Sequence, residues 1–199
     1  MYLIIDNTKD INTAKMTPLL IEYMKDRKKK HIMISGQDEL YEVISKYKSE
    51  LKGVILSGGP FLLSQKTELY KYSKNFTALI EFQNIPVLGI CFGYQVMSMA
   101  YGGFIKKLEK KKSGLEEVSI DHSVDIFNGL SRKIKVYQSH KDYLDKCPDN
   151  FDIIAVNEDN KIEGIQNIEK KRYGFQFHPE KTPEGHKIID NFIKICEGS

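Results

Sequence analysis

Short apolar runs with strand character alternate with longer amphipathic stretches in the first half of the chain. The runs are Tyr2–Ile5, His31–Ser35, Val54–Ser57 and Val87–Cys91, and the helix-compatible stretches between them are Asn12–Arg27, Gln37–Ser49 and Thr67–Gln83. Strands that alternate with helices predict βαβ units, in which helices cover both faces of a mostly parallel sheet. Pro18 lies within the first amphipathic stretch and predicts either a first helical turn or a break there.

The pattern changes after Gly102-Gly103, where short strand-like segments follow one another with turn residues between them. These segments are Phe104–Glu109, Leu115–Ile120, Ile134–Ser139, Phe151–Asn157, Lys161–Ile168 and Tyr173–His178. They predict a mixed or antiparallel extension of the sheet. A last helix is predicted from about Pro183 to Cys196, because its apolar residues recur with helical spacing. We expect a single α/β domain over residues 1–199, since a chain of 199 residues can bury one substantial core.

Composition excludes several classes of protein. The net charge is only +3, and the short lysine runs favour solvated surface over nucleic-acid binding. No apolar run reaches the roughly 18 residues of a membrane span, and the N-terminus resembles a first strand, not a signal peptide. The three cysteines are scattered without a CxxC pair, which predicts neither a disulfide framework nor a zinc site. A cytoplasmic, reducing environment is therefore expected.

Cys91 is the strongest candidate for chemistry. It ends an apolar run, has Gly89 and Gly93 two positions away on either side, and precedes the helix-compatible stretch Tyr94–Ala100. Strand, sharp turn and helix form the layout of a nucleophile elbow, here with sulfur in place of oxygen. A lone cysteine is most often a small buried hydrophobe, but the flanking glycines favour the elbow.

His178 and Glu180 supply a base and a carboxylate two positions apart, after the strand pattern that begins at Tyr173. Ligands of open α/β sheets bind beyond the carboxyl ends of the strands, where Cys91 is also expected. We therefore predict a Cys–His–Glu triad, in which the histidine moves protons and the glutamate orients the imidazole.

A second loop, Ser57–Pro60, follows another predicted strand end. The backbone N–H groups of Gly59 and Phe92 are predicted to form an oxyanion hole beside the cysteine. His31, His122 and His186 do not lie at matching strand ends, so a structural position is favoured for each of them.

Five segments, taken in order, resemble the class I (triad-type) glutamine amidotransferases, and among them the glutaminase subunit of archaeal-type GMP synthetase. They are VILSGGP at Val54–Pro60, VLGICFGYQ at Val87–Gln95, VYQSHKD at Val136–Asp142, FDIIAVN at Phe151–Asn157 and YGFQFHPE at Tyr173–Glu180. The resemblance implies a flavodoxin-like mixed sheet and one glutaminase domain. It also implies that Cys91 attacks the side-chain amide of glutamine and that a glutamyl thioester is then hydrolysed.

The same resemblance implies which groups bind substrate and where the ammonia goes. Gln95 and the backbone around Ser139, Lys141 and Asp142 are expected to hold glutamine. Ammonia is expected to pass to an ATP-dependent synthetase subunit that converts XMP to GMP. No cofactor is expected on this chain, because ATP and Mg²⁺ would belong to that partner.

Three departures from the family pattern leave other functions open. The first loop is Asp6–Asp10, Phe61 follows Gly-Gly-Pro, and Lys181 follows His-Pro-Glu directly. One alternative is a self-sufficient γ-glutamyl hydrolase with the same triad. Another is a catalytically silent protein that senses glutamine or regulates a synthetase. The pattern does not decide whether His140 contacts glutamine, supports its loop or faces a partner.

Overall fold

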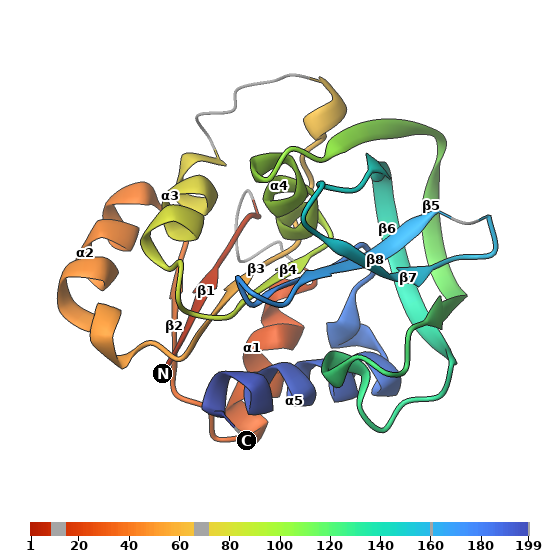
Figure 1. Ribbon diagram of the computed structural model, residues 1–199. Coiled ribbons are helices and arrows are strands. Elements are labelled where there is room, and N and C mark those ends of the chain that lie inside the picture. The colour runs from red at the N-terminus through yellow and green to blue at the C-terminus, as the bar shows by residue number, and fades with distance from the viewer. Residues whose placement is uncertain (9–14, 66–71, 160, 199) are drawn as a thin grey trace.

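A single mixed sheet organises the computed structural model, which describes residues 1–8, 15–65, 72–159 and 161–198 (Figure 1). Within these residues the sheet has nine strands in the order β2-β1-β3-β4-β9-β8-β6-β5-β7. The parallel part comprises β1 (Tyr2–Ile5), β2 (His31–Ile34), β3 (Gly53–Leu56), β4 (Val87–Ile90) and β9 (Arg172–Phe175). The antiparallel part comprises β5 (Phe104–Ile120), β6 (Lys133–Lys146), β7 (Asp152–Val156) and β8 (Ile162–Asn167). The predicted parallel sheet with an antiparallel extension is confirmed.

Helices cover both faces of the parallel strands. One face carries α1 (Thr17–Asp26) and α5 (Pro183–Glu197), and the other carries α2 (Gln37–Tyr47), α3 (Ser73–Glu81) and α4 (Phe92–Ala100). Successive residues of β1 point to opposite faces of the sheet. Ile4 packs with residues of α1 and α5, and Leu3 packs with residues of α2, α3 and α4. Both faces of the strand are buried, which explains why it consists of a continuous apolar run. None of the helices in the described ranges has the length and apolar character needed to cross a membrane.

The predicted helices are found with shifted boundaries. Pro18 lies in the first turn of α1, which is the first of the two alternatives predicted for it. Residues 12–14 of the first predicted helix and 67–71 of the third lie outside the described residues. The second predicted helix ends as a short 3-10 turn, Lys48–Glu50.

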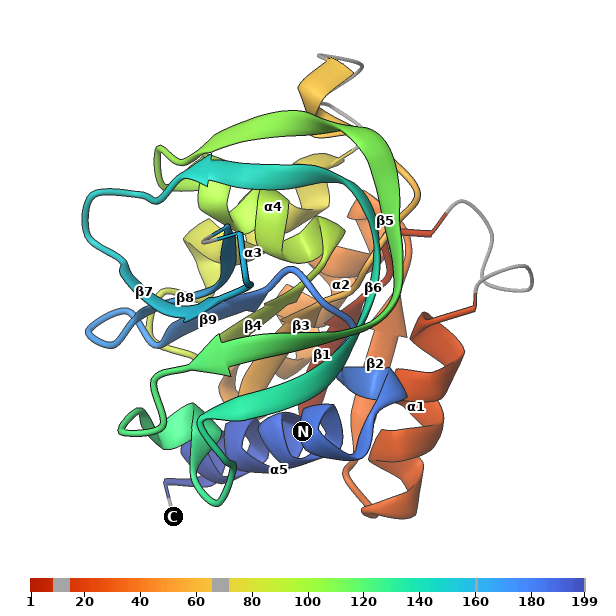
Figure 2. The same cartoon turned by 90° about the vertical axis from the view of Figure 1, so that its right-hand side faces the viewer.

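Two predictions about the second half were wrong. Phe104–Glu109 and Leu115–Ile120 belong to one long strand, β5, which curves beside the somewhat shorter β6 (Figure 2). The register of this pair shifts between Lys107 and Lys112, and the exposed, lysine-rich sequence at that bulge has the polarity of a turn. The last strand ends at Phe175, so His178 lies beyond it and pairs instead through an isolated bridge with Tyr137.

Candidate active site

Cys91 occupies the predicted turn between β4 and α4. Its backbone has φ 49° and ψ −103°, a conformation that side-chain-bearing residues rarely adopt. A Cβ on Gly89 would lie 2.8 Å from the backbone of Tyr94, and one on Gly93 would lie 2.2 Å from the carbonyl oxygen of Leu56. Both flanking glycines are therefore required by close packing, and the elbow geometry is confirmed.

His178 and Glu180 lie beside the cysteine. His178 Nδ1 donates a hydrogen bond to Glu180 Oε1 at 2.8 Å, and both side chains are buried. A Cβ on Gly58 would be 2.9 Å from His178 Cε1 and 3.7 Å from Cys91 Cβ, so the two residues pack against the same glycine. The loop after β3, the elbow after β4 and the segment after β9 thus meet at one edge of the sheet, as the sequence predicts.

The electrostatics favour a charged imidazole. Burial lowers the pKa of His178, but the charges of Glu180 and Cys91, together with hydrogen bonds to both, outweigh it and raise the pKa to about 10. Since Nδ1 is bonded to Glu180, the other ring nitrogen, Nε2, faces the sulfur. The arrangement is that of a cysteine beside a charged imidazole, which a carboxylate holds from the other side.

The start of α5 supports the turn that carries the histidine and the glutamate. His186 Nε2 lies 3.2 Å from the carbonyl oxygen of Glu180 and donates to it. Gly185 packs so closely under Pro179 that an added Cβ would be 2.3 Å from the Pro179 oxygen. His186 therefore has a structural position, as predicted, and from it the side chain contacts the backbone of the candidate triad.

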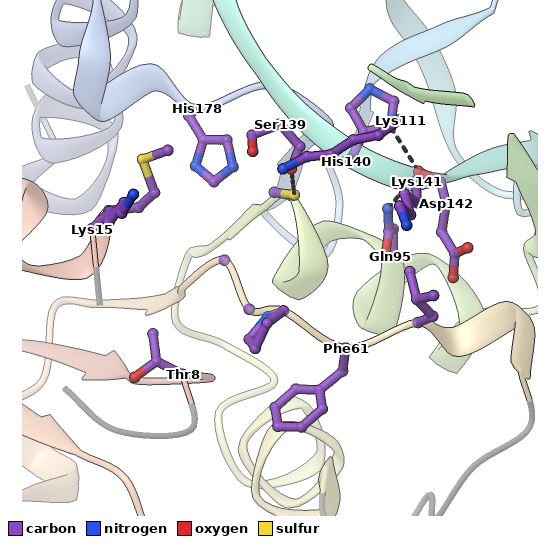
Figure 3. Close-up of a pocket in the computed structure, with 16 residues that line it drawn as sticks. Thr8, Lys15, Phe61, Gln95, Lys111, Ser139, His140, Lys141, Asp142 and His178 are labelled. Atoms are coloured by element: carbon purple, nitrogen blue, oxygen red, sulfur yellow. Dashed lines mark hydrogen bonds between the residues drawn. The ribbon is translucent and has the colours of Figure 1, made fainter. Parts of the chain in front are cut away.

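A cavity of about 580 Å³ opens in front of the sulfur (Figure 3). Among the predicted site residues, those that line it are Cys91, His178, Gly59, Gln95, Ser139, Lys141 and Asp142. Glu180 lies behind His178, and Phe92 begins α4 beneath the cysteine. The cavity therefore brings together the candidate nucleophile, its base and the segments predicted to hold substrate.

Asp142 and Gln95 form hydrogen bonds within the cavity wall. The Asp142 carboxylate accepts from Ser64, at 2.9 Å from the backbone nitrogen and 2.6 Å from the hydroxyl. Its carbonyl oxygen accepts from Gln95 Nε2 at 2.9 Å and from His140 Nδ1 at 2.8 Å (Figure 3). These bonds shape the wall, and contact of either residue with glutamine stays a prediction.

Gln176 is a site residue that the sequence reasoning missed. Its Nε2 lies 3.8 Å from Cys91 Sγ, and its Oε1 accepts from Gln95 at 3.0 Å. The carbonyl oxygen of Ser139 lies 3.9 Å from the same sulfur. The available signal in the sequence was a polar residue between Phe175 and Phe177, within a predicted strand.

The three departures from the family pattern have separate structural positions. Phe61 lines the cavity, with its ring centroid 5.2 Å from that of Tyr72 and 5.8 Å from that of Phe92. Lys181 is exposed, and its Nζ lies 3.6 Å above the ring of Tyr137. In the first loop, Asp6 and Asn7 are buried, whereas residues 9 and 10 lie outside the described residues.

His140 makes stability depend on pH. Burial lowers its pKa to about 4, against the hydrogen bond to Asp142 and with the help of Lys112 and His178. The unfolded chain, with an ordinary histidine pKa of about 6.5, binds this proton more readily. Its contribution to the free energy of unfolding is therefore complete above pH 6.5 and lost as the pH falls from 6.5 to 4. We expect His140→Asn, which keeps a donor for Asp142, to flatten this fall in urea unfolding.

The control for this prediction is His122→Asn, because His122 is exposed. It should leave the dependence of unfolding free energy on pH unchanged. Curves for His140→Asn and the unaltered chain that stay parallel between pH 4 and 6.5 would contradict the prediction.

Fold and site together define a thiol enzyme with a Cys–His–Glu arrangement on a mixed α/β sheet. The chain belongs to the glutamine amidotransferase class-I family, whose model matches residues 3–196. The glutamine-hydrolysing GMP synthase subunit of Methanothermobacter thermautotrophicus is 37% identical over 166 residues, which cover 82% of this chain and 83% of that protein. The corresponding protein of Pyrococcus abyssi is 40% identical over 146 residues, covering 72% and 75%.

Solved structures agree with this assignment. A Thermoplasma acidophilum protein described as a GMP synthase subunit superposes with a TM-score of 0.83 at 27% identity, covering 99% of this chain and 94% of that one. A glutamine amidotransferase of Thermotoga maritima gives a TM-score of 0.72 at 19% identity, covering 99% and 84%, and supports the fold alone.

Proposed function

We propose that this chain hydrolyses glutamine and supplies the ammonia to a synthetase subunit that aminates XMP to GMP. The observation that carries the hydrolysis is the array of Cys91, His178 and Glu180 at the cavity. The names of the relatives support the choice of partner, since they are glutamine-hydrolysing subunits of GMP synthase. ATP and Mg²⁺ are expected to bind that partner.

The geometry supports a two-stage reaction. The Cys91 thiolate attacks the side-chain carbonyl carbon of glutamine, and the oxyanion that forms is held by the N–H groups of Gly59 and Phe92. His178 Nε2 then donates its proton to the departing nitrogen, so that ammonia leaves and a glutamyl thioester remains. In the second stage His178 accepts a proton from water, which attacks the thioester and releases glutamate and the thiolate.

Glu180 has a supporting role in this scheme. Its hydrogen bond to Nδ1 fixes the tautomer and the orientation of the imidazole, and its charge stabilises the imidazolium. The wall formed by Gln95, Ser139 and Asp142 would hold the rest of the substrate, and Lys141 contributes a cation at the same wall.

The test combines the purified chain with an ATP-pyrophosphatase subunit of GMP synthase. With ATP, Mg²⁺, XMP and glutamine, we expect glutamate and GMP to appear in equal amounts. We also expect glutamine hydrolysis to be much slower when that partner is left out. Cleavage of γ-glutamyl peptides without any partner would instead identify a γ-glutamyl hydrolase. Glutamine binding with no turnover in the full mixture would identify a sensor.

A further inference from the structure

Ser57, the first residue after β3, forms an unusually complete set of hydrogen bonds. Its Oγ accepts from the backbone N–H of Asn7 at 3.0 Å and donates to the carbonyl oxygen of Gly58 at 3.0 Å. Its own carbonyl oxygen accepts from Asn7 Nδ2 at 2.9 Å and from the backbone N–H of Gly93 at 3.1 Å. The side chain is only 2% exposed. A glutamine-hydrolysing mechanism uses none of these groups directly.

The bond from Ser57 Oγ to the Gly58 oxygen fixes the plane of the next peptide. In a trans peptide the C=O and N–H groups point in opposite directions. Holding the Gly58 carbonyl toward the serine hydroxyl therefore turns the N–H of Gly59 the other way. Glycines on both sides of this peptide make its rotation otherwise easy. The Ser57 hydroxyl thus opposes rotation of the Gly58–Gly59 peptide, which would change the direction of the Gly59 N–H.

Asn7, which donates to the Ser57 hydroxyl, is itself held in place by other contacts. Asn7 and Asn75 form a reciprocal pair of side-chain amide hydrogen bonds, at 3.1 Å and 2.8 Å, and both are buried. An added Cβ on Gly59 would lie 2.5 Å from the carbonyl oxygen of Asn7, so the loop packs directly on this residue. Because the Asn7 N–H already donates to Oγ, the serine proton is left to the Gly58 carbonyl.

We infer that Ser57 is a positioning residue for the oxyanion hole, since its hydroxyl sets the direction of the Gly59 N–H. This inference rests on the proposed glutamine hydrolysis. It assigns to Ser57 an effect on the tetrahedral oxyanion and none on the thiolate. The two effects can be separated because a glutamine aldehyde analogue, glutamate γ-semialdehyde, forms a tetrahedral adduct with the cysteine. Iodoacetamide alkylates the thiolate without needing an oxyanion hole.

The decisive variant is Ser57→Ala. We expect kcat for glutamine to fall about 10-fold to 100-fold, which is less than the loss of a whole oxyanion donor. The affinity for the aldehyde should fall by a similar factor. KM for glutamine and the rate of Cys91 alkylation should stay within about twofold, because ground-state binding and the thiolate are unaffected.

Ser98→Ala is the matched control. Ser98 is also a buried serine, and its Oγ also donates to a backbone carbonyl, that of Tyr94 at 2.8 Å. It should change stability in urea unfolding without changing the aldehyde affinity. Ser57→Thr keeps the hydroxyl and should retain most of the turnover. It also serves as the test should the alanine variant fail to fold.

Two results would overturn the inference. In the first, Ser57→Ala binds the aldehyde as tightly as the control variant Ser98→Ala does. In the second, the rate of Cys91 alkylation in Ser57→Ala falls in parallel with kcat. Failure of the proposed function would look different. An unaltered chain that binds the aldehyde but releases no ammonia, even with the synthetase subunit, would refute glutamine hydrolysis. The comparison of aldehyde affinities would still decide the role of Ser57.

Discussion

Replacing Cys91 with alanine is expected to abolish glutamine hydrolysis, with a loss in kcat of about 10⁵-fold to 10⁶-fold. Alanine keeps the shape of the elbow but lacks the sulfur that forms the thioester in the cavity. Alanine also keeps the strained backbone, so the free energy of unfolding should change by only about 1 kcal/mol. Ammonia release and urea unfolding, measured on the same preparation, check the two halves of the prediction.

Cys147→Ala is the control for this result. Cys147 is partly buried in the second half of the chain, and its Sγ lies 3.5 Å from the carbonyl oxygen of Phe151, away from the cavity. Its replacement should leave turnover intact. Substantial turnover by the Cys91 variant would contradict the thioester mechanism, whichever synthetase subunit is present.

Glu180→Gln is expected to lower kcat by about 10³-fold to 10⁴-fold, as loss of charge does at the equivalent position of a serine triad. Glutamine fills the same space, but it removes the larger of the two charges that raise the pKa of His178. Burial, which lowers this pKa, is then opposed less strongly, so the imidazole should lose its proton at a lower pH than in the unaltered chain. The upper pH limit of the remaining activity should move down accordingly.

The same substitution should alter the dependence of stability on pH. The pKa of His178 is raised from 6.5 to about 10 in the folded chain. Its contribution to the free energy of unfolding is therefore complete below pH 6.5 and lost as the pH rises toward 10. Glu180→Gln should flatten this loss. Glu184→Gln, in the first turn of α5, is the control and should change neither rate nor slope. Unaltered activity in Glu180→Gln would contradict the role of this glutamate in the triad.

Much of the site could be predicted because its chemistry follows strand ends. The elbow at Cys91 and the packing of Gly58 against both Cys91 and His178 depend on local sequence and on the parallel topology, which periodicity reveals. The single strand from Phe104 to Ile120 could not be predicted in the same way. Its middle is largely exposed, so it lacks the alternation of apolar and polar residues that indicates a strand.

The residues that contact the cavity wall from behind could not be predicted for another reason. Gln176 contacts the sulfur only because β9 ends beside the elbow, and Ser64 binds the carboxylate of Asp142 only because β6 passes the loop after β3. Such contacts join segments that are 85 and 78 residues apart, so a local pattern can mark a residue such as Gln176 but cannot name its partner. Asp142 illustrates the limit: its motif predicts a substrate contact through the backbone, which stays a prediction, and gives no sign that its carboxylate accepts from Ser64.

The left-handed backbone at residue 91 gives a way to read related chains. Glycine would suit this torsion better than any other amino acid, and a protein with no catalytic task would gain from having it there. A cysteine at this point therefore indicates that natural selection has favoured reactivity over ease of folding. Among relatives of this fold, glycine in the elbow would mark members that have lost the nucleophile and gained the easier backbone.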